Sequence, residues 1–132
     1  MAGTRSLEPF VRSLLRVVVG FTFSLHGAQK LLGLFGGMKG GTVHFGSIFW
    51  FAGFLELVGG VLMILGLFTC PVAFILSGEM AIAYFKMHFP KGFFPIQNGG
   101  ELAAVYCFVF LYLCVAGAGR LSLDSLVRKK SS

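Results

Sequence analysis

Two glutamates lie inside long apolar stretches of this sequence, where a carboxylate has chemical consequences. Glu56 stands near the centre of the apolar segment 45–68, and Glu79 lies within the next one, 71–88. An ionised carboxylate at the centre of a bilayer costs roughly 2.5–3.5 kcal/mol unless it is paired, hydrated or protonated. Such groups either hydrogen-bond across helices as protonated acids or take part in proton and quinone chemistry. The sequence leaves both interpretations open.

The spacing of neighbouring residues predicts which faces these groups occupy. Glu56 shares a helix face with Gly53 and Gly60, and small residues let helices approach closely, so this face should point into the protein. If 45–68 and 71–88 are antiparallel helices, Glu56 and Glu79 lie at comparable depth. The candidate intramembrane polar site comprises His26, Lys30, Glu56, Glu79 and Glu101, and a candidate polar mouth at the non-cytoplasmic side comprises Lys86, His88 and Asn98.

The histidines and cysteines form no recognisable metal or redox motif. There is no Cys-x-x-Cys, so Cys70, Cys107 and Cys114 are interpreted as buried small hydrophobic side chains. His26 and His88 could ligate a haem only if their rings converged, and interface histidines explain them more simply. We therefore predict no metal site.

Two short polar segments have a structural interpretation. In Asn98-Gly99-Gly100-Glu101, Asn98 can cap a helix and Glu101 can reach back to it as in a capping box. Ser122-Leu123-Asp124 can begin a short interfacial helix. Both assignments are compatible with a further functional role.

The composition indicates what surrounds these residues. Hydrophobic residues make up 56% of the 132 residues and charged residues only 12%. A soluble domain of this size could not bury so much apolar surface, so a lipid bilayer is the expected solvent. We predict an all-α fold: one domain, 1–132, forming an integral membrane four-helix bundle with spans at about 10–32, 45–68, 71–88 and 101–119. Arg16 and Lys30 are expected near the two faces of the first span, with their side chains extended outward.

The net charge of +6 is explained by membrane topology. Basic residues gather on cytoplasmic loops, which favours an N-in/C-in orientation. The cytoplasmic side would then hold Arg5, Arg12, Arg16, Arg120, Arg128, Lys129 and Lys130, against Lys30, Lys39, Lys86 and Lys91 on the other side. No nucleic-acid-binding motif is present, so nucleic acid is not an expected partner.

With these residues assembled, the chain resembles the DoxX family of small four-helix membrane proteins over about residues 10–126. The segments that carry the resemblance are His26-Gly27-Ala28-Gln29-Lys30-Leu31, Leu55-Glu56-Leu57-Val58-Gly59-Gly60, Leu65-Gly66-Leu67, Glu79-Met80-Ala81-Ile82-Ala83, Asn98-Gly99-Gly100-Glu101 and Gly117-Ala118-Gly119-Arg120-Leu121-Ser122-Leu123-Asp124. No single segment is specific, but their order and spacing are.

The resemblance implies an inner-membrane protein linked to quinone-dependent redox complexes. A quinone is then the candidate cofactor, and a membrane or peripheral redox protein is the expected partner beside the lipid bilayer. The chain would be a subunit and not a complete enzyme. A non-catalytic assembly or chaperone factor is the main alternative, followed by a small transporter or proton pathway. Self-association, the substrate and the reaction stay open.

Overall fold

The computed structural model describes residues 2–37 and 43–131, and the regular structure in these ranges is entirely helical. The all-α prediction is therefore confirmed. The helices, in chain order, are α1 (Ala2–Arg5), α2 (Glu8–Leu32), α3 (Ile48–Leu65), α4 (Thr69–Ala83), a π-helical turn (Tyr84–His88), a 3-10 turn (Phe89–Lys91), α5 (Pro95–Asn98), α6 (Glu101–Ala116) and α7 (Leu123–Ser131). Lys39, which the topology argument counts, lies outside the described residues.

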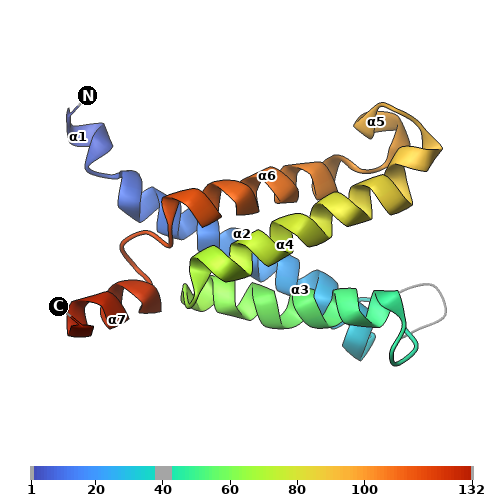
Figure 1. The fold of residues 1–132 in the computed structure, drawn as a ribbon, viewed down its shortest axis with the longest axis horizontal. Coiled ribbons are helices and arrows are strands. Elements are labelled where there is room, and N and C mark those ends of the chain that lie inside the picture. Colours follow the sequence, from blue (N-terminus) through green and yellow to red (C-terminus); the bar gives the residue numbers. More distant parts are fainter. Residues whose placement is uncertain (1, 38–42, 132) are drawn as a thin grey trace.

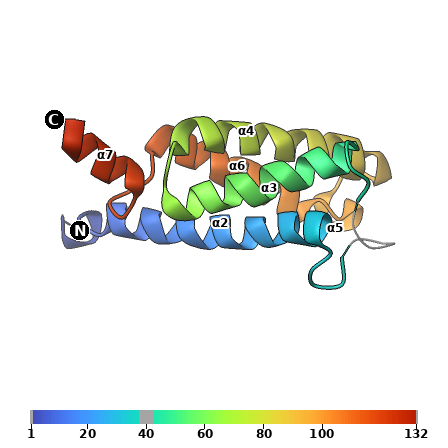
Figure 2. The same ribbon diagram turned by 90° about the horizontal axis from the view of Figure 1, so that it is seen from below.

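The long helices pack in a chain of neighbours. α2 lies along α3, α4 lies along α6, and α3 also contacts α4. Both termini lie at one end of the molecule, while α5 lies at the opposite end (Figures 1 and 2). The core between the helices contains Phe23, whose ring meets Tyr106 and Phe110 edge-on at centroid distances of 5.1 and 4.9 Å. Large apolar side chains also cover much of the outer surface, as a lipid environment requires.

Length and composition single out two stretches as able to cross a membrane. These are Ile48–Leu65 and Thr69–Lys91, the latter including the π-helical and 3-10 turns after α4. α6 is apolar but has only 16 residues, and the 25 residues of α2 include Glu8, Arg12, Arg16 and Lys30. The four span boundaries given above therefore stay predictions.

Helices α2 and α3 touch backbone to backbone through glycines. A methyl group on Gly20 would come within 2.8 Å of the Gly60 carbonyl oxygen, and one on Gly60 within 2.7 Å of Cβ of Ser24. Gly53, Glu56 and Gly60 are all buried, so the predicted inward face of this helix is confirmed. The close approach places polar side chains on the facing side of α2 within reach of α3.

The Gly27→Ala substitution is expected to destabilise the protein by about 1–3 kcal/mol, because its new methyl group would collide with the backbone of Leu57 and Gly53. The free energy of unfolding in mixed detergent micelles measures this. The matched control is Gly78→Ala, where nothing lies within 4 Å of the new methyl group. That variant should be neutral or gain up to about 1 kcal/mol from helix propensity. Equal effects at the two sites would contradict the packing argument.

Arg16 does not extend outward as predicted. It is 1% exposed, and its guanidinium donates to the carbonyl oxygens of Met63 (2.7 Å), Ile64 (3.3 Å), Leu121 (2.7 Å) and Ala118. The last carbonyls of a helix lack the full set of partners that its interior provides, and the segment after α6 wraps over the end of α3. The arginine turns inward because these carbonyl groups offer its planar donors more partners than one headgroup would.

The segment 122–124 begins α7, as predicted, since Ser122 Oγ accepts a hydrogen bond from the Ser125 N–H at 3.1 Å. Asp124 has a second role that was not predicted. Its carboxylate accepts hydrogen bonds from the backbone N–H groups of Phe68 (2.8 Å) and Thr69 (2.9 Å). These groups open α4, which has no cap from its own N-terminal residue. A residue of α7 thus caps α4.

Removing this cap with Asp124→Ala is expected to cost about 1–2 kcal/mol, because two N–H groups at a positive helix end lose a charged acceptor. Thermal unfolding in detergent provides the measurement. Glu101→Ala serves as the control, since Glu101 also lies in the first turn of a helix but is exposed and caps nothing. A loss in the control as large as in Asp124→Ala would show that the cap is not the cause.

Candidate functional site

An ion pair joins α2 and α3 inside the protein. Lys30 Nζ lies 2.8 Å from Oε1 and 2.6 Å from Oε2 of Glu56, which is 3% exposed. Gly53 makes this possible, because a methyl group there would lie 2.9 Å from Cβ of Lys30 and displace the lysine stem. Lys30 was predicted to extend outward, and this is wrong. The buried carboxylate of Glu56, one helical turn after Gly53 on α3, attracts the Lys30 ammonium inward.

Glu79 brings a second carboxyl group to the same place from α4. Both of its oxygens are buried, and neither has a partner with full hydrogen-bond geometry among the described residues, although the group lies next to the Glu56 carboxyl. The group lies close enough to Glu56 and Lys30 to interact electrostatically with both. Two carboxyl groups therefore share one ammonium. Only one of the two possible negative charges is balanced by the ammonium, and a second one is costly in a low-dielectric interior.

His26 lies one helical turn before Lys30 and packs against Tyr106 of α6. The two ring centroids are 6.2 Å apart in an edge-on contact. The Tyr106 hydroxyl donates a hydrogen bond to Thr22 Oγ1 at 2.8 Å. Tyr106 and Thr22 were not singled out from the sequence. In the sequence, the only feature that marks these two residues is a hydroxyl group inside an apolar stretch. Many residues that serve only in packing have the same feature.

The predicted mouth divides into two parts. Asn98 is buried, with Nδ2 donating to Gly92 O at 2.9 Å, and its own carbonyl lies 3.3 Å from His88 Nδ1. Tyr84, from the π-helical turn, adds its hydroxyl 3.3 Å from Asn98 Nδ2. Lys86 is exposed and joins neither this cluster nor an ion pair within the described ranges. His26 and His88 belong to separate clusters.

The predicted capping box is wrong. α6 begins at Glu101 with Gly100 before it, so Glu101 occupies the first helical position, and its exposed side chain caps nothing. Asn98 ends the separate turn α5, which Gly99 closes with a left-handed φ of 76°. Asn98 Oδ1 instead accepts from Gly100 N at 2.8 Å. Glu101 therefore stands apart from the cluster of Lys30, Glu56 and Glu79.

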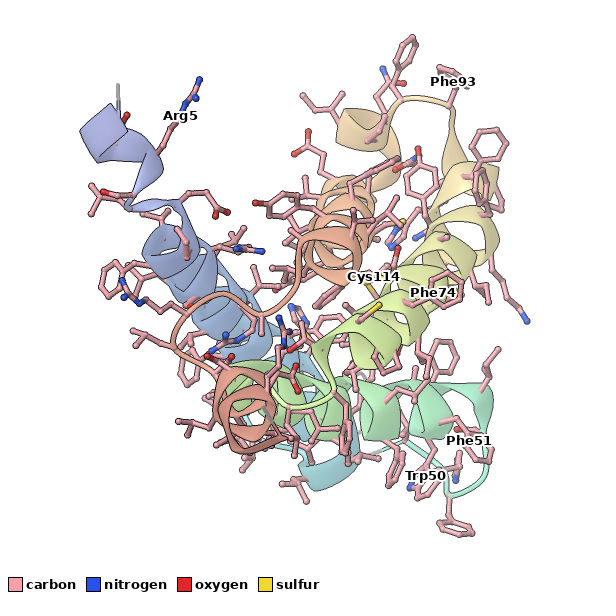
Figure 3. The ribbon with its side chains drawn as sticks, turned by 60° about the vertical axis from the view of Figure 1, so that its left-hand side comes forward. Arg5, Trp50, Phe51, Phe74, Phe93 and Cys114 are labelled. Carbon is pink, nitrogen blue, oxygen red and sulfur yellow. The ribbon has the colours of Figure 1, made fainter. Side chains whose placement is uncertain are left out.

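The cysteines are not all buried hydrophobic side chains, as the sequence had suggested. Cys70, in the first turn of α4, is exposed, and its sulfur lies 3.2 Å from that of Cys114 near the end of α6. Figure 3 labels Cys114, which α6 carries. In the part of the chain that the structure describes, no group of three or more His, Cys, Asp or Glu residues could hold a metal ion.

Comparison with known proteins places this arrangement in a family. The DoxX family model matches residues 11–89, which carry Lys30, Glu56 and Glu79. The chain belongs to the DoxX family. It is accordingly a membrane protein, in agreement with its apolar helices.

Curated relatives cover most of this DoxX protein. An uncharacterised protein of Haemophilus influenzae is 47% identical over 134 residues, which span 98% of this chain and 100% of the relative. A Bacillus subtilis protein named "Putative oxidoreductase CatD" is 33% identical over 122 residues, 88% of this chain and 86% of the relative. No solved structure matches.

Proposed function

We propose that this DoxX protein crosses the inner membrane four times, through α2, α3, α4 and α6, with both termini in the cytoplasm. The shared end of the two termini supports this topology (Figure 1). At 1.5 Å per residue, the 25 residues of α2 are about 37 Å long, enough to span a hydrocarbon core of about 30 Å. Its charges need not meet lipid, because Arg16 and Lys30 point inward.

Within that membrane, the proposed role is a membrane subunit or accessory of a quinone-linked oxidoreductase system. The observation that carries it is the buried Glu79 carboxyl, which lacks a partner with full hydrogen-bond geometry, next to the Lys30–Glu56 ion pair. A buried polar group of this kind is costly, so a ligand that accepts or donates a hydrogen bond there would be favoured. The name of one relative, "Putative oxidoreductase CatD", is consistent with a redox function.

The cluster suits the chemistry of a quinone head group. A bound quinone would take up two electrons from a partner redox protein and two protons, one from the Glu79 carboxyl and one from solvent as the product leaves the site. Glu79, when protonated, donates a hydrogen bond to a carbonyl oxygen and can release that proton. Lys30 stabilises the carboxylate that remains, and Glu56 holds Lys30 in place through both of its oxygens. Burial excludes bulk water from this exchange.

The Glu79→Gln substitution is expected to weaken binding of a short-chain ubiquinone or menaquinone analogue about tenfold, because an amide N–H is a weaker hydrogen-bond donor than a carboxylic acid O–H while the side-chain shape stays. Fluorescence or calorimetric titration of the purified protein in nanodiscs measures the affinity. Glu101→Gln removes an exposed carboxyl outside the cluster and should leave binding unchanged. Unchanged binding in Glu79→Gln, or no binding by the fully assembled complex, would contradict the proposal.

A non-catalytic assembly factor is the second candidate, and one observation favours it. Both carboxylate oxygens of Glu56 contact Lys30 Nζ, so Glu56 finds its partner within the protein. Polar groups that join two membrane helices behave in this way. Under this role, Glu56→Gln and Glu79→Gln should lower thermal stability but leave the host pathway active. A stable, normally assembled variant that has lost pathway activity would rule it out.

A further inference from the structure

We propose that Cys70 and Cys114 are the site of a reversible disulfide that links the start of α4 to the end of α6. Their sulfur atoms lie 3.2 Å apart, although 44 positions separate them in the chain. A disulfide bond is about 2.05 Å long, so a movement of little more than 1 Å closes it. This inference does not depend on quinone binding.

The surroundings of the two thiols favour reaction. Cys70 is not covered by the rest of the protein and is the second residue of α4, at the end of the proposed span, while Cys114 is only partly covered. Both residues lie at helix ends, Cys70 in the first turn of α4 and Cys114 two residues before α6 ends. Small adjustments are easier there than in a helix centre. Since this end also carries both termini, the proposed topology puts the pair near the cytoplasmic face (Figure 2), where disulfides are transient and regulatory.

The third cysteine provides an internal contrast. Cys107 lies in the middle of α6, where its sulfur contacts Ser77 Oγ at 3.5 Å and no other cysteine. It shares the same helix and the same membrane as Cys114 but lacks a thiol neighbour. Oxidation should therefore discriminate between the two.

The oxidant is a low-molecular-weight disulfide such as oxidised glutathione. The Cys70 thiolate attacks one of its sulfurs, forms a mixed disulfide and releases one thiol. Cys114, after losing its proton to solvent, then attacks Cys70 Sγ, forms the Cys70–Cys114 bond and releases the second thiol. Two protein thiols are oxidised, one small disulfide is reduced to two thiols, and the same exchange runs backward under a reducing agent.

The experiment counts free thiols in the full-length protein in nanodiscs, equilibrated in glutathione buffers of increasing oxidised fraction. Blocking with maleimide–polyethylene glycol after denaturation gives one gel shift for each free thiol. Wild type should fall from three free thiols to one, and Cys107→Ser from two to none, reversibly. Cys70→Ser should keep two, whereas Cys114→Ser can lose the Cys70 thiol only as a glutathione adduct, which mass spectrometry identifies by its added mass and which no second cysteine of the chain resolves.

Three outcomes would overturn the proposal. The first is wild type that keeps three free thiols even in fully oxidised glutathione. The second is thiol loss that a non-reducing gel traces to a dimer between chains. The third is equal loss in Cys70→Ser and in Cys107→Ser. Because serine matches cysteine closely in size, these variants should fold. Mass spectrometry of the oxidised Cys107→Ser protein, two mass units lighter than its reduced form, provides a readout that does not depend on labelling.

Discussion

Lys30→Met is expected to produce one of the two largest losses of stability of any single substitution in this protein, about 3–5 kcal/mol. The methionine fills the space of the lysine stem but leaves two carboxyl groups, Glu56 and Glu79, facing each other without a cation. Both must then be neutralised in a buried site. Unfolding in mixed micelles, monitored by circular dichroism, measures the change in the free energy of unfolding.

Glu56→Gln should cost clearly less than Lys30→Met. The lysine keeps an acceptor in the glutamine amide and a countercharge in nearby Glu79, so the positive charge is not left alone. The double variant Lys30→Met/Glu56→Gln should recover part of the stability lost in Lys30→Met, because one stranded carboxyl group is gone. If Lys30→Met were the milder variant, the three-group cluster would not describe the energetics. Lys86→Met, at an exposed lysine outside the cluster, should have little effect.

Arg16→Leu is the second variant expected to be severely destabilised, by at least about 3 kcal/mol. Its guanidinium donates to carbonyl groups from two separate parts of the chain, and leucine removes all of these buried hydrogen bonds at once. Arg16→Lys should recover only a fraction, since one ammonium cannot reach carbonyls that a planar fork serves together.

The measurement for Arg16 is thermal unfolding together with the yield of monodisperse protein after purification. Arg5→Leu is the matched control, because Arg5 is exposed in α1. A milder effect of Arg16→Leu than of Arg5→Leu would mean that headgroup contacts, and not the carbonyl network, govern these arginines.

The helical class and the inward face of α3 could be predicted from the sequence, because both follow from local patterns. A run of apolar residues and two glycines spaced two helical turns apart, Gly53 and Gly60, indicate burial directly. The capping box failed for a local reason as well. Gly99 and Gly100 allow the chain to end one turn and start another, which a motif of residue types does not reveal.

The contacts of the charged residues could be predicted less well, since they depend on distant parts of the chain. Glu56 and Glu79 were identified because a carboxylate in an apolar span stands out by its cost. The turning inward of Lys30 and Arg16 was missed, as both lie close enough to the span ends to reach headgroups. Only the packing of α2 against α3 shows that these side chains turn into the protein and do not extend toward headgroups. The pairing of Cys70 with Cys114 likewise joins two helices that are not consecutive.

The hydrogen bonds of Arg16 and Asp124 also bear on how the protein is made. Arg16 emerges early from the ribosome, but two of its acceptors, Ala118 and Leu121, are synthesised about a hundred residues later. The N–H groups that begin α4 likewise wait for Asp124. Residues 118–124 must therefore be synthesised before this end of the molecule can close. A chain that stops short of them leaves polar groups of α2, α3 and α4 uncovered at a single end.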